Sequence, residues 1–446
     1  MISSMSATRL ARQSSRIAHQ AVQRRALSTA GSFETYTAEG VKVASRDLQS
    51  PTSKIAVVAK AGTRFQPLPG LTVGLEEFAY KSTAKRSALR IARETELLGG
   101  QLKSYHTREA LVLEASFLRE DLPYFTELLA EVVSQTKYTT HEFHEEVEEV
   151  VHRKQGALAP NAIATALDAA HSVAFHTGLG SPLYPNAAST KSYLSEGSIA
   201  AYAQAVYNKS NIAFVAEGAA QPIVNKWAEV FFKDIPASAG AGALSLNTTA
   251  TKYYGGEQRV SHSHGNSMVL AFPTASGAEA DVLAALLGGQ SSIKWSVGFS
   301  ALGQVAAKFP GLSIATANTA YTDAGLLTIT LSGSSSVVSK GAAEVVKAIK
   351  AIATSTVSKE SLAKAVAQSK FAALEATQST SGALFTTASG LLFNSPSVAT
   401  KVKALESVTA DKVSKAAKAL LEQKASVAAV GDLHALPYAE EIGLRV

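Results

Sequence analysis

No cysteine occurs among the 446 residues of the chain. This absence excludes disulfide bonds, thiolate nucleophiles and metal or iron–sulfur centres that are held by cysteine. It fits a reducing compartment. Any catalytic or metal site must therefore be built from histidine, carboxylate, hydroxyl or amine groups.

Long apolar runs are also missing, and no stretch reaches the ~18 residues that a transmembrane helix needs. Residues 282–287 are typical, because this apolar run is short enough to lie inside a core helix. We therefore expect no membrane-spanning helix, and membrane association only through partners. With 46% hydrophobic and 17% charged residues, the chain can bury a large core, and its length suggests two to four domains.

Acidic residues are absent from the amino terminus, where the first carboxylate is Glu34. Residues 1–33 contain no lysine but five arginines. Removal of residues 1–27 would take away these five charges and lower the formal net charge from +6 to +1. The basic overall charge is therefore no argument for nucleic-acid binding, which needs a clustered basic face.

This arginine-rich start has the composition of a mitochondrial transit peptide. Arg9, Arg12 and Arg16 fall on one helical face, and no apolar segment of a secretory signal follows. The sequence around Leu27 and Ser28 resembles a matrix-peptidase cleavage pattern, so we predict a transit peptide over residues 1–27 with cleavage between these two residues. The alternative is a disordered basic tail.

The order of structural signals in the first half of the chain recurs in the second half. The first half predicts strands at 36–44 and 54–61, a helical region at 71–98, a hairpin at 104–117, helices at 121–135, 140–155, 162–175 and 198–207, a strand at 210–216 and a helix at 221–232. The second half predicts strands at 260–272, a helix at 277–287, a hairpin at 317–332, helices at 338–353, 359–377 and 381–393, and a strand at 425–433. Matching segments are separated by about 213 to 220 residues, which indicates an internal duplication.

Small and polar residues dominate positions 236–251, which are typical of a flexible linker. We therefore predict an α+β fold with two homologous halves that could close on each other like a clamshell. The predicted domains are an amino-terminal half at 28–235, a linker at 236–255 and a carboxy-terminal half at 256–446.

One motif carries a family resemblance. Residues 70–83 (GLTVGLEEFAYKST) are similar to the signature of the insulinase and processing-peptidase family, in which H-x-x-E-H precedes an aromatic stretch and K-G-T. Leu75 and Glu76 match its L-E, and residues 61–64 (AGTR) resemble the A-G-S-R of the family. The resemblance implies two α/β-sandwich halves of the peptidase type.

The metal-binding positions of this motif have changed. In such an inverted zinc motif two histidines hold the metal and the glutamate between them activates water. Here the histidine positions are Val73 and Glu77, and the region of the third ligand, a glutamate in the family, reads Arg153-Lys154-Gln155. Glu76 is retained, but without a zinc-bound water it has nothing to activate. The resemblance therefore implies no catalytic residue, no metal and no cofactor.

Several other histidines are candidate metal ligands. His141, His144 and His152 lie among glutamates on a predicted helix, which permits a metal site but favours a solvated face. His262 and His264 alternate along a predicted strand, where surface placement is expected. We expect His171 and His176, in or beside a helix pair, to be bonded to a partner or exposed.

Within the family, residues 286–333, and 320–326 above all, resemble the core subunits of ubiquinol–cytochrome c reductase (complex III). The resemblance implies a scaffold on the matrix side of the mitochondrial inner membrane. Its implied partners are core protein 1, cytochrome b, cytochrome c1 and small subunits of a dimeric complex.

Two alternatives stay open. The first is the non-catalytic, presequence-binding subunit of the processing peptidase. The acid-rich stretch 142–149 favours this alternative. That subunit carries a glycine-rich loop, whereas residues 286–299 contain only three glycines. The second is an autonomous metallopeptidase with an unrecognised metal site.

Overall fold

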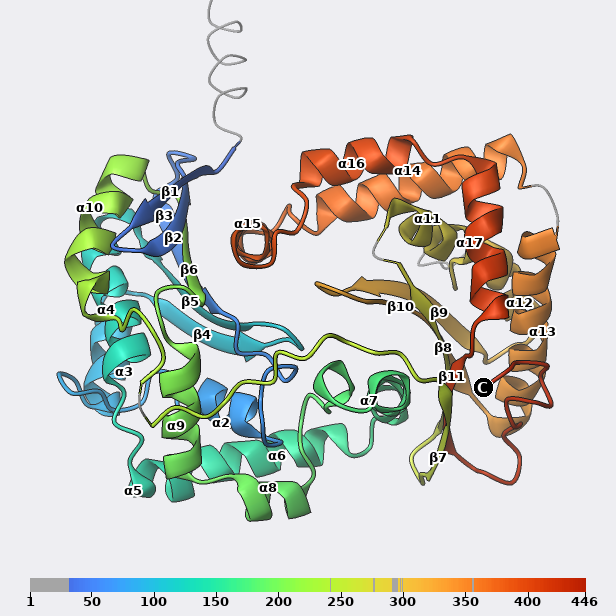
Figure 1. The fold of residues 1–446 in the computed structure, drawn as a ribbon, viewed down its shortest axis with the longest axis horizontal. Coiled ribbons are helices and arrows are strands. Elements are labelled where there is room, and N and C mark those ends of the chain that lie inside the picture. Colours follow the sequence, from blue (N-terminus) through green and yellow to red (C-terminus); the bar gives the residue numbers. More distant parts are fainter. Residues whose placement is uncertain are drawn as a thin grey trace, which may run out of the picture.

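The computed structural model describes residues 32–446 except 241, 276, 291–295, 297, 299, 355 and 356. The predicted transit peptide and the cleavage site at Leu27 and Ser28 lie outside the described residues. The chain forms two halves, each built on one mixed sheet with helices on both faces (Figure 1). This arrangement confirms the predicted α+β fold with two similar halves.

The first sheet has six strands in the order β1-β2-β6-β3-β5-β4. Alternate residues of β3 face opposite sides: Ile55 and Val57 join the core beneath the outer helices, whereas Ala56 and Val58 face the middle of the molecule. The strands are β1 (Glu34–Ala38), β2 (Val41–Arg46), β3 (Thr52–Ala59), β4 (Gln101–His106), β5 (Leu111–Leu118) and β6 (Ile212–Glu217).

The second sheet repeats the connectivity of the first with five strands, in the order β7-β11-β8-β10-β9. In each half the last strand inserts beside the first strands, so β6 runs parallel to β2 and β11 runs parallel to β7. All six residues of β6 and of β11 are buried. The strands are β7 (Gly256–Ser261), β8 (Asn266–Thr274), β9 (Ser313–Ala320), β10 (Gly325–Gly333) and β11 (Ser426–Gly431).

The helices follow the predicted order. The first half contains α2 (Leu71–Glu77), α3 (Ala88–Leu97), α4 (Leu122–Gln135), α5 (Thr140–Glu142), the π-helical turn η2 (Phe143–Val147), α6 (Glu148–Leu158), α7 (Ala162–Phe175), α8 (Ala187–Tyr193), α9 (Glu196–Val206) and α10 (Gln221–Phe231). The second half contains α11 (Ala278–Leu287), α12 (Ala301–Lys308), α13 (Ser335–Thr354), α14 (Lys359–Glu375), α15 (Thr380–Phe393), α16 (Val398–Glu406) and α17 (Ala410–Glu422). Helices α8, α12, α16 and α17 were not predicted from the sequence.

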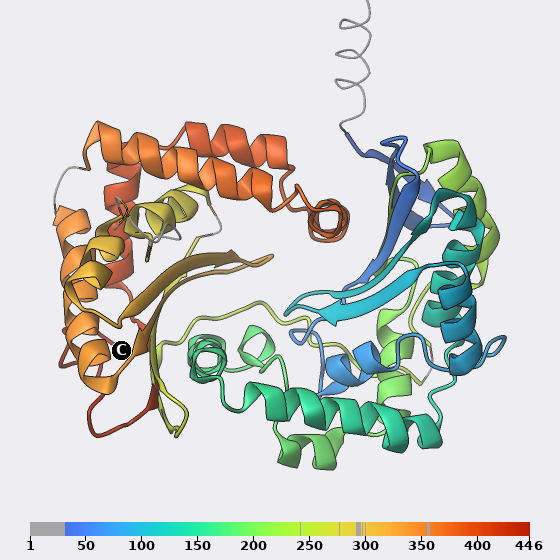
Figure 2. The same cartoon turned by 180° about the vertical axis from the view of Figure 1, so that it is seen from behind.

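The two halves exchange one helix each. Helix α7 of the first half packs on the second sheet, where its alanines contact β8, β10 and β11. Helix α15 of the second half packs on the first sheet, against β2, β3 and β6. Both helices lie in the middle of the molecule between the two sheets, as the front and back views agree (Figures 1 and 2). Each core is therefore completed by the other half.

The predicted linker has no helix or strand among its described residues, but it is not free of the first half. Ala243, Leu244 and Leu246 pack against the first core. The Asn247 amide donates to the Phe65 carbonyl at 3.0 Å, and the Leu244 amide donates to the Ala201 carbonyl at 3.2 Å. The expectation of a flexible connection is thus wrong for this packed portion.

No helix in the described part of the chain is long and apolar enough to cross a membrane.

Candidate functional site

Helix α2 carries the family motif and is almost completely enclosed. Six of its seven residues are buried. It begins after Gly70, whose φ of 95° lies in the left-handed region that favours glycine. A Cβ at Gly74 would lie 2.6 Å from the Ile199 side chain, so this glycine lets α9 approach closely. The helix is held between α9, β4 and α6.

Val73 lies on the buried side of α2 and has no exposed surface. It belongs to the first hydrophobic core, together with Leu71 and Leu75. Its side chain offers no lone pair, so it contributes packing at the position where the family motif has a histidine.

Glu76 is buried and both of its carboxylate oxygens are engaged. Oε1 accepts from Lys154 Nζ at 2.6 Å, and Oε2 contacts His106 Nδ1 at the end of β4. The other ring nitrogen of His106 lies 3.0 Å from the Leu183 carbonyl. The side chains of Glu76 and His106 are 3% and 1% exposed. Three segments that are distant in sequence thus meet at this carboxylate.

Glu77 shares the same ammonium group. Lys154 Nζ forms an ion pair with Glu77, so one lysine bridges two neighbouring carboxylates of α2. The Tyr184 ring completes the enclosure, with its centroid 5.2 Å from the His106 ring and 5.9 Å from Lys154 Nζ. We call Glu76, Glu77, His106 and Lys154 the charge cluster.

The surroundings shift the pKa values of Glu76, Lys154 and Tyr184. Burial raises the pKa of Glu76, but the hydrogen bonds and charges of His106 and Lys154 outweigh burial and hold the pKa below its usual range. Burial lowers the pKa of Lys154, yet the two carboxylates more than offset this and raise the pKa well above its ordinary value. Burial and the Glu76 charge raise the pKa of Tyr184. The carboxylate and the ammonium are both charged at neutral pH.

These residues do not fit a zinc ion, which the unaltered motif of the family would hold. A catalytic zinc site takes three protein ligands with free lone pairs. Here Val73 has no donor atom, and an ammonium group lies against both Glu76 and Glu77. Across residues 32–446, leaving aside those that are not described, no group of three histidine, cysteine or carboxylate side chains is arranged to hold a metal.

Sequence reasoning found Glu76, Glu77 and the Lys154 region but missed His106. Its signal was weak, because His106 lies 30 residues from Glu76 and only the packing of α2 against β4 brings them together. The predicted hairpin at 104–117 contains this histidine, yet nothing local distinguishes it from a surface residue.

The helical segment formed by α5, η2 and α6, which we call the acidic helix, has the solvent-exposed face that the sequence favours. The side chains of His141, His144 and His152 are 71%, 59% and 46% exposed. Each pairs with a glutamate of its own helical segment, Glu145 or Glu148.

The remaining histidines lie elsewhere. His262 and His264 were expected on a strand, and this is wrong: β7 ends at Ser261 and both residues occupy the exposed turn before β8. Gly265, with φ at 124°, reverses the chain there. His171 is buried and bonded to the Leu167 carbonyl and the Tyr321 hydroxyl, and burial lowers its pKa to about 3. His176 stacks on Tyr254.

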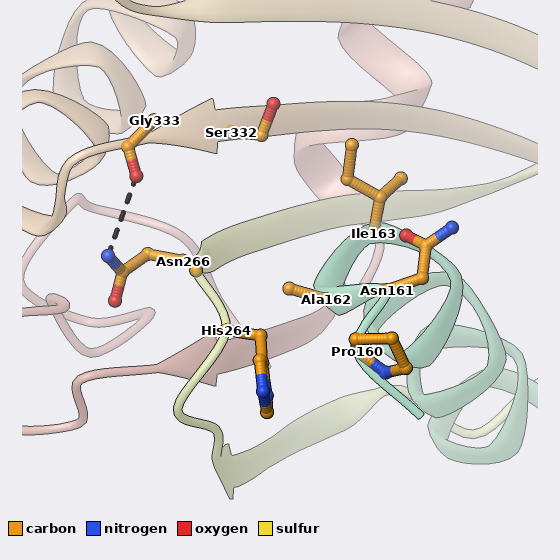
Figure 3. Close-up of a pocket in the computed structure, with 9 residues that line it drawn as sticks. Pro160, Asn161, Ala162, Ile163, His264, Asn266, Ser332 and Gly333 are labelled. Carbon is orange, nitrogen blue, oxygen red and sulfur yellow. Dashed lines mark hydrogen bonds between the residues drawn. The ribbon is translucent and has the colours of Figure 1, made fainter. Parts of the chain in front are cut away.

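A surface pocket of about 530 Å³ lies away from the charge cluster, at the start of α7 (Figure 3). The turn before β8 and the end of β10 complete its walls. Asn161 caps α7 by accepting from the Ala164 amide, and Asn266 donates to the Gly333 carbonyl at 3.5 Å. Its polar groups thus serve the fold, and no residue of the family motif lines it.

Comparison with known proteins agrees with the motif. Residues 42–186 match the insulinase family (peptidase family M16), and residues 193–369 match the peptidase M16 inactive domain. A mitochondrial cytochrome b-c1 complex subunit 2 from Neurospora crassa is 59% identical over 428 residues, which cover 94% of this chain and 93% of the relative. The protein of the same name from Cryptococcus neoformans is 39% identical, with coverage of 92% and 94%.

A more distant relative is the mitochondrial-processing peptidase subunit alpha of Solanum tuberosum, which is 28% identical over 50% of this chain and 44% of its own length. Two matched domains and full-length similarity to the subunit 2 proteins lead to one assignment. The chain belongs to the insulinase (M16) peptidase family and, within it, to the family of cytochrome b-c1 complex subunit 2 proteins.

Proposed function

We propose that this chain is the non-catalytic core subunit 2 of the mitochondrial cytochrome b-c1 complex, also called complex III or ubiquinol–cytochrome c reductase. The observation that carries the proposal is the 59% identity to a protein of that name along 94% of the chain. In this role the chain is a scaffold that supports the assembly and stability of the complex, and electron transfer takes place in other subunits.

The absence of peptidase activity is part of the proposal. Residues 193–369 match a domain that is described as inactive. In the first half, Val73 fills a core position and Lys154 binds the two carboxylates of the motif helix. These contacts support a chain that has lost the zinc ligands of the family and keeps Glu76 as a structural residue.

The proposed partners are core protein 1, cytochrome b, cytochrome c1 and small subunits, in a dimeric complex on the matrix side of the inner membrane. Both relatives are named mitochondrial cytochrome b-c1 complex subunit 2, which supports assembly of this chain into that complex. An obligate assembly of this kind commonly buries more than about 2,000 Å² of surface. Residues 1–27 would serve as the import signal.

A second candidate is the presequence-binding subunit of the processing peptidase. Two observations favour it: the distant similarity to the alpha subunit from Solanum tuberosum, and the exposed glutamates of the acidic helix. The alpha-subunit similarity covers only half of each chain, so it ranks second.

Affinity purification of the tagged chain from detergent-solubilised mitochondria, followed by native electrophoresis, separates the two. The main proposal expects the chain in a complex that carries the haem absorbance of cytochromes b and c1. Recovery with a zinc-bearing peptidase subunit, in a complex free of haem, would favour the second candidate and contradict the first. An untagged strain controls for carry-over.

A further inference from the structure

Both carboxylates at the end of α2 face one ammonium group. Lys154 Nζ lies 2.6 Å from Glu76 Oε1 and also contacts Glu77, although lysine and Glu76 are 78 residues apart in the chain. The two glutamate side chains are only 3% and 13% exposed. Because water reaches neither of them freely, each depends on a neighbouring positive charge or donor to remain ionised.

His106 contacts the second carboxylate oxygen of Glu76. One ring nitrogen faces the carboxylate and the other faces the Leu183 carbonyl. Carboxylate and carbonyl oxygens only accept hydrogen bonds, so the His106 ring meets an acceptor at each of its two nitrogens. Glu76 therefore lies between the Lys154 ammonium and the His106 ring.

We infer that the Lys154 ammonium serves as the built-in cation of this site, in place of a metal ion, and thereby joins α2 to α6. The family resemblance puts a metal-binding glutamate in the region of residues 153–155, and the residue that reaches the motif helix from there is a lysine. A positive side chain thus supplies, from within the chain, the counter-charge that the motif carboxylates need. This role concerns the chain alone and holds whichever complex the chain joins.

The physical argument for this role is the asymmetry between keeping and breaking a buried ion pair. A complete pair contributes little net stability, but loss of one partner leaves an uncompensated buried charge, which is strongly destabilising. Lys154 is 35% exposed, so water compensates part of that loss. The remaining penalty falls on α2 and on β4, which the cluster connects.

Amide hydrogen exchange of the full-length protein tests the inference. Lys154→Met removes the charge and keeps the length of the side chain, and we expect exchange of the α2 and β4 amides to accelerate on the order of tenfold. Lys154→Arg retains the charge and should keep most of the protection. Arg153→Met, at an exposed neighbour on the same helix, is the matched control and should leave both elements unchanged.

A second variant keeps the test decisive if Lys154→Met does not fold. The double variant Glu76→Gln/Lys154→Met removes one buried carboxylate together with the ammonium, and we expect it to recover protection in α2. Equal protection of α2 in Lys154→Met and Arg153→Met would overturn the inference. It would also be overturned if the loss of α2 protection in the double variant equalled the sum of the losses in Glu76→Gln and Lys154→Met. Thermal stabilisation of the unmodified protein by one equivalent of zinc chloride, lost in Glu76→Gln, would also overturn it.

Discussion

The two exchanged helices occupy matching places in the duplicated fold, yet they are held by different chemistry. Helix α7 meets the second sheet through small apolar side chains: Ala166, Ala170 and Ala174 have no exposed surface and pack on Val269 and its neighbours. The helix therefore approaches the sheet closely, as small residues permit.

Helix α15 meets the first sheet through larger side chains and through charge. Leu384 and Leu392 are buried against the sheet, and the buried Glu114 of β5 binds both Lys54 at 2.7 Å and the Ser381 hydroxyl at 3.0 Å. At the other end of the helix, Lys42 donates to the Leu391 carbonyl at 2.5 Å. A cation at this end also complements the helix dipole.

This difference teaches that a duplicated architecture fixes where an exchanged helix lies but not how it is bound. Most of the contact on the α7 side is apolar and nondirectional, although the hydrogen bond between His171 and the Tyr321 hydroxyl also ties the helix to the second half. The α15 side adds Glu114, whose hydrogen-bond partners define one register of the helix on the sheet.

The largest effect is expected for Leu384→Ala, which empties a fully buried position beneath α15. Loss of the side chain and the remaining cavity should reduce the free energy of local unfolding of α15 by about 3 kcal/mol. Hydrogen exchange of the α15 amides measures this loss. Leu374→Ala, on an exposed position of α14, is the control, and a similar loss there would contradict the packing argument.

Glu114→Gln should have the next largest effect, since it keeps the shape of the side chain but leaves Lys54 without its counter-charge. We expect α15 to lose about 2 kcal/mol of protection, because hydrogen bonds to charged groups contribute more than neutral ones. Exchange of α7 should stay unchanged. Glu360→Gln, at an exposed pair within α14, serves as the control. Equal loss of hydrogen-exchange protection in α7 and α15 would show that the two interfaces are not independent.

Ala166→Leu addresses the apolar side. The added methyl groups have no space between α7 and the second sheet, so overpacking should cost about 1.5 kcal/mol of α7 protection. The measurement is again local hydrogen exchange, with Ala164→Leu on the partly exposed side of the same helix as the control. Full tolerance of the substitution would mean that α7 does not need close contact.

The smallest expected effect is a difference between the two halves in their loss of stability on acidification. The pKa of Asp47 is lowered by its bond from Arg119, and that of Glu76 is lowered by His106 and Lys154 despite burial. Since a lowered folded-state pKa gives stability that is present above the unfolded pKa and lost as pH falls through the folded one, the first half should weaken as the pH falls below the ordinary carboxylate pKa of about 4.

Exchange of α2 and β4 should accordingly rise on acidification before that of β8 and β10. Among the described residues the second half offers fewer such acids. Burial raises the pKa of Asp323 but Arg64 of the first half lowers it by more, and Glu344, Glu360 and Glu406 owe their lowered pKa to lysines on the exposed surface. Glu76→Gln should reduce the difference between the halves. Simultaneous opening of both halves in the unmodified protein would contradict the prediction.

The sequence predicted most elements because their periodicity is local. The bounds of α7 agree with the predicted helix at 162–175, which begins after the capping residue Asn161. Helix α17 had a usable signal, with Val413, Ala417 and Leu420 on one buried face, but it lies outside the segments that the repeat comparison matched. Periodicity finds a helix and its buried face wherever the pattern is examined.

The local sequence of a helix does not say which element packs on its buried face. The alanines of α7 predict close packing, but nothing in them distinguishes the sheet of their own half from that of the other half. The same limit applies to the charge cluster. Glu76 and Lys154 stood out by their motif positions, whereas His106 enters only through the register of β4 beside α2.

The helix exchange also has a consequence for the order in which the chain folds. The bond between Lys42 and Leu391 spans 349 residues, so the inner face of the first sheet has no cover until nearly nine-tenths of the polypeptide exists. During synthesis from the amino terminus, the first sheet must wait with Ala56, Val58 and Val215 open to solvent. An apolar surface that stays exposed during folding promotes aggregation with other chains, and a chaperone that binds unfolded chains would protect it.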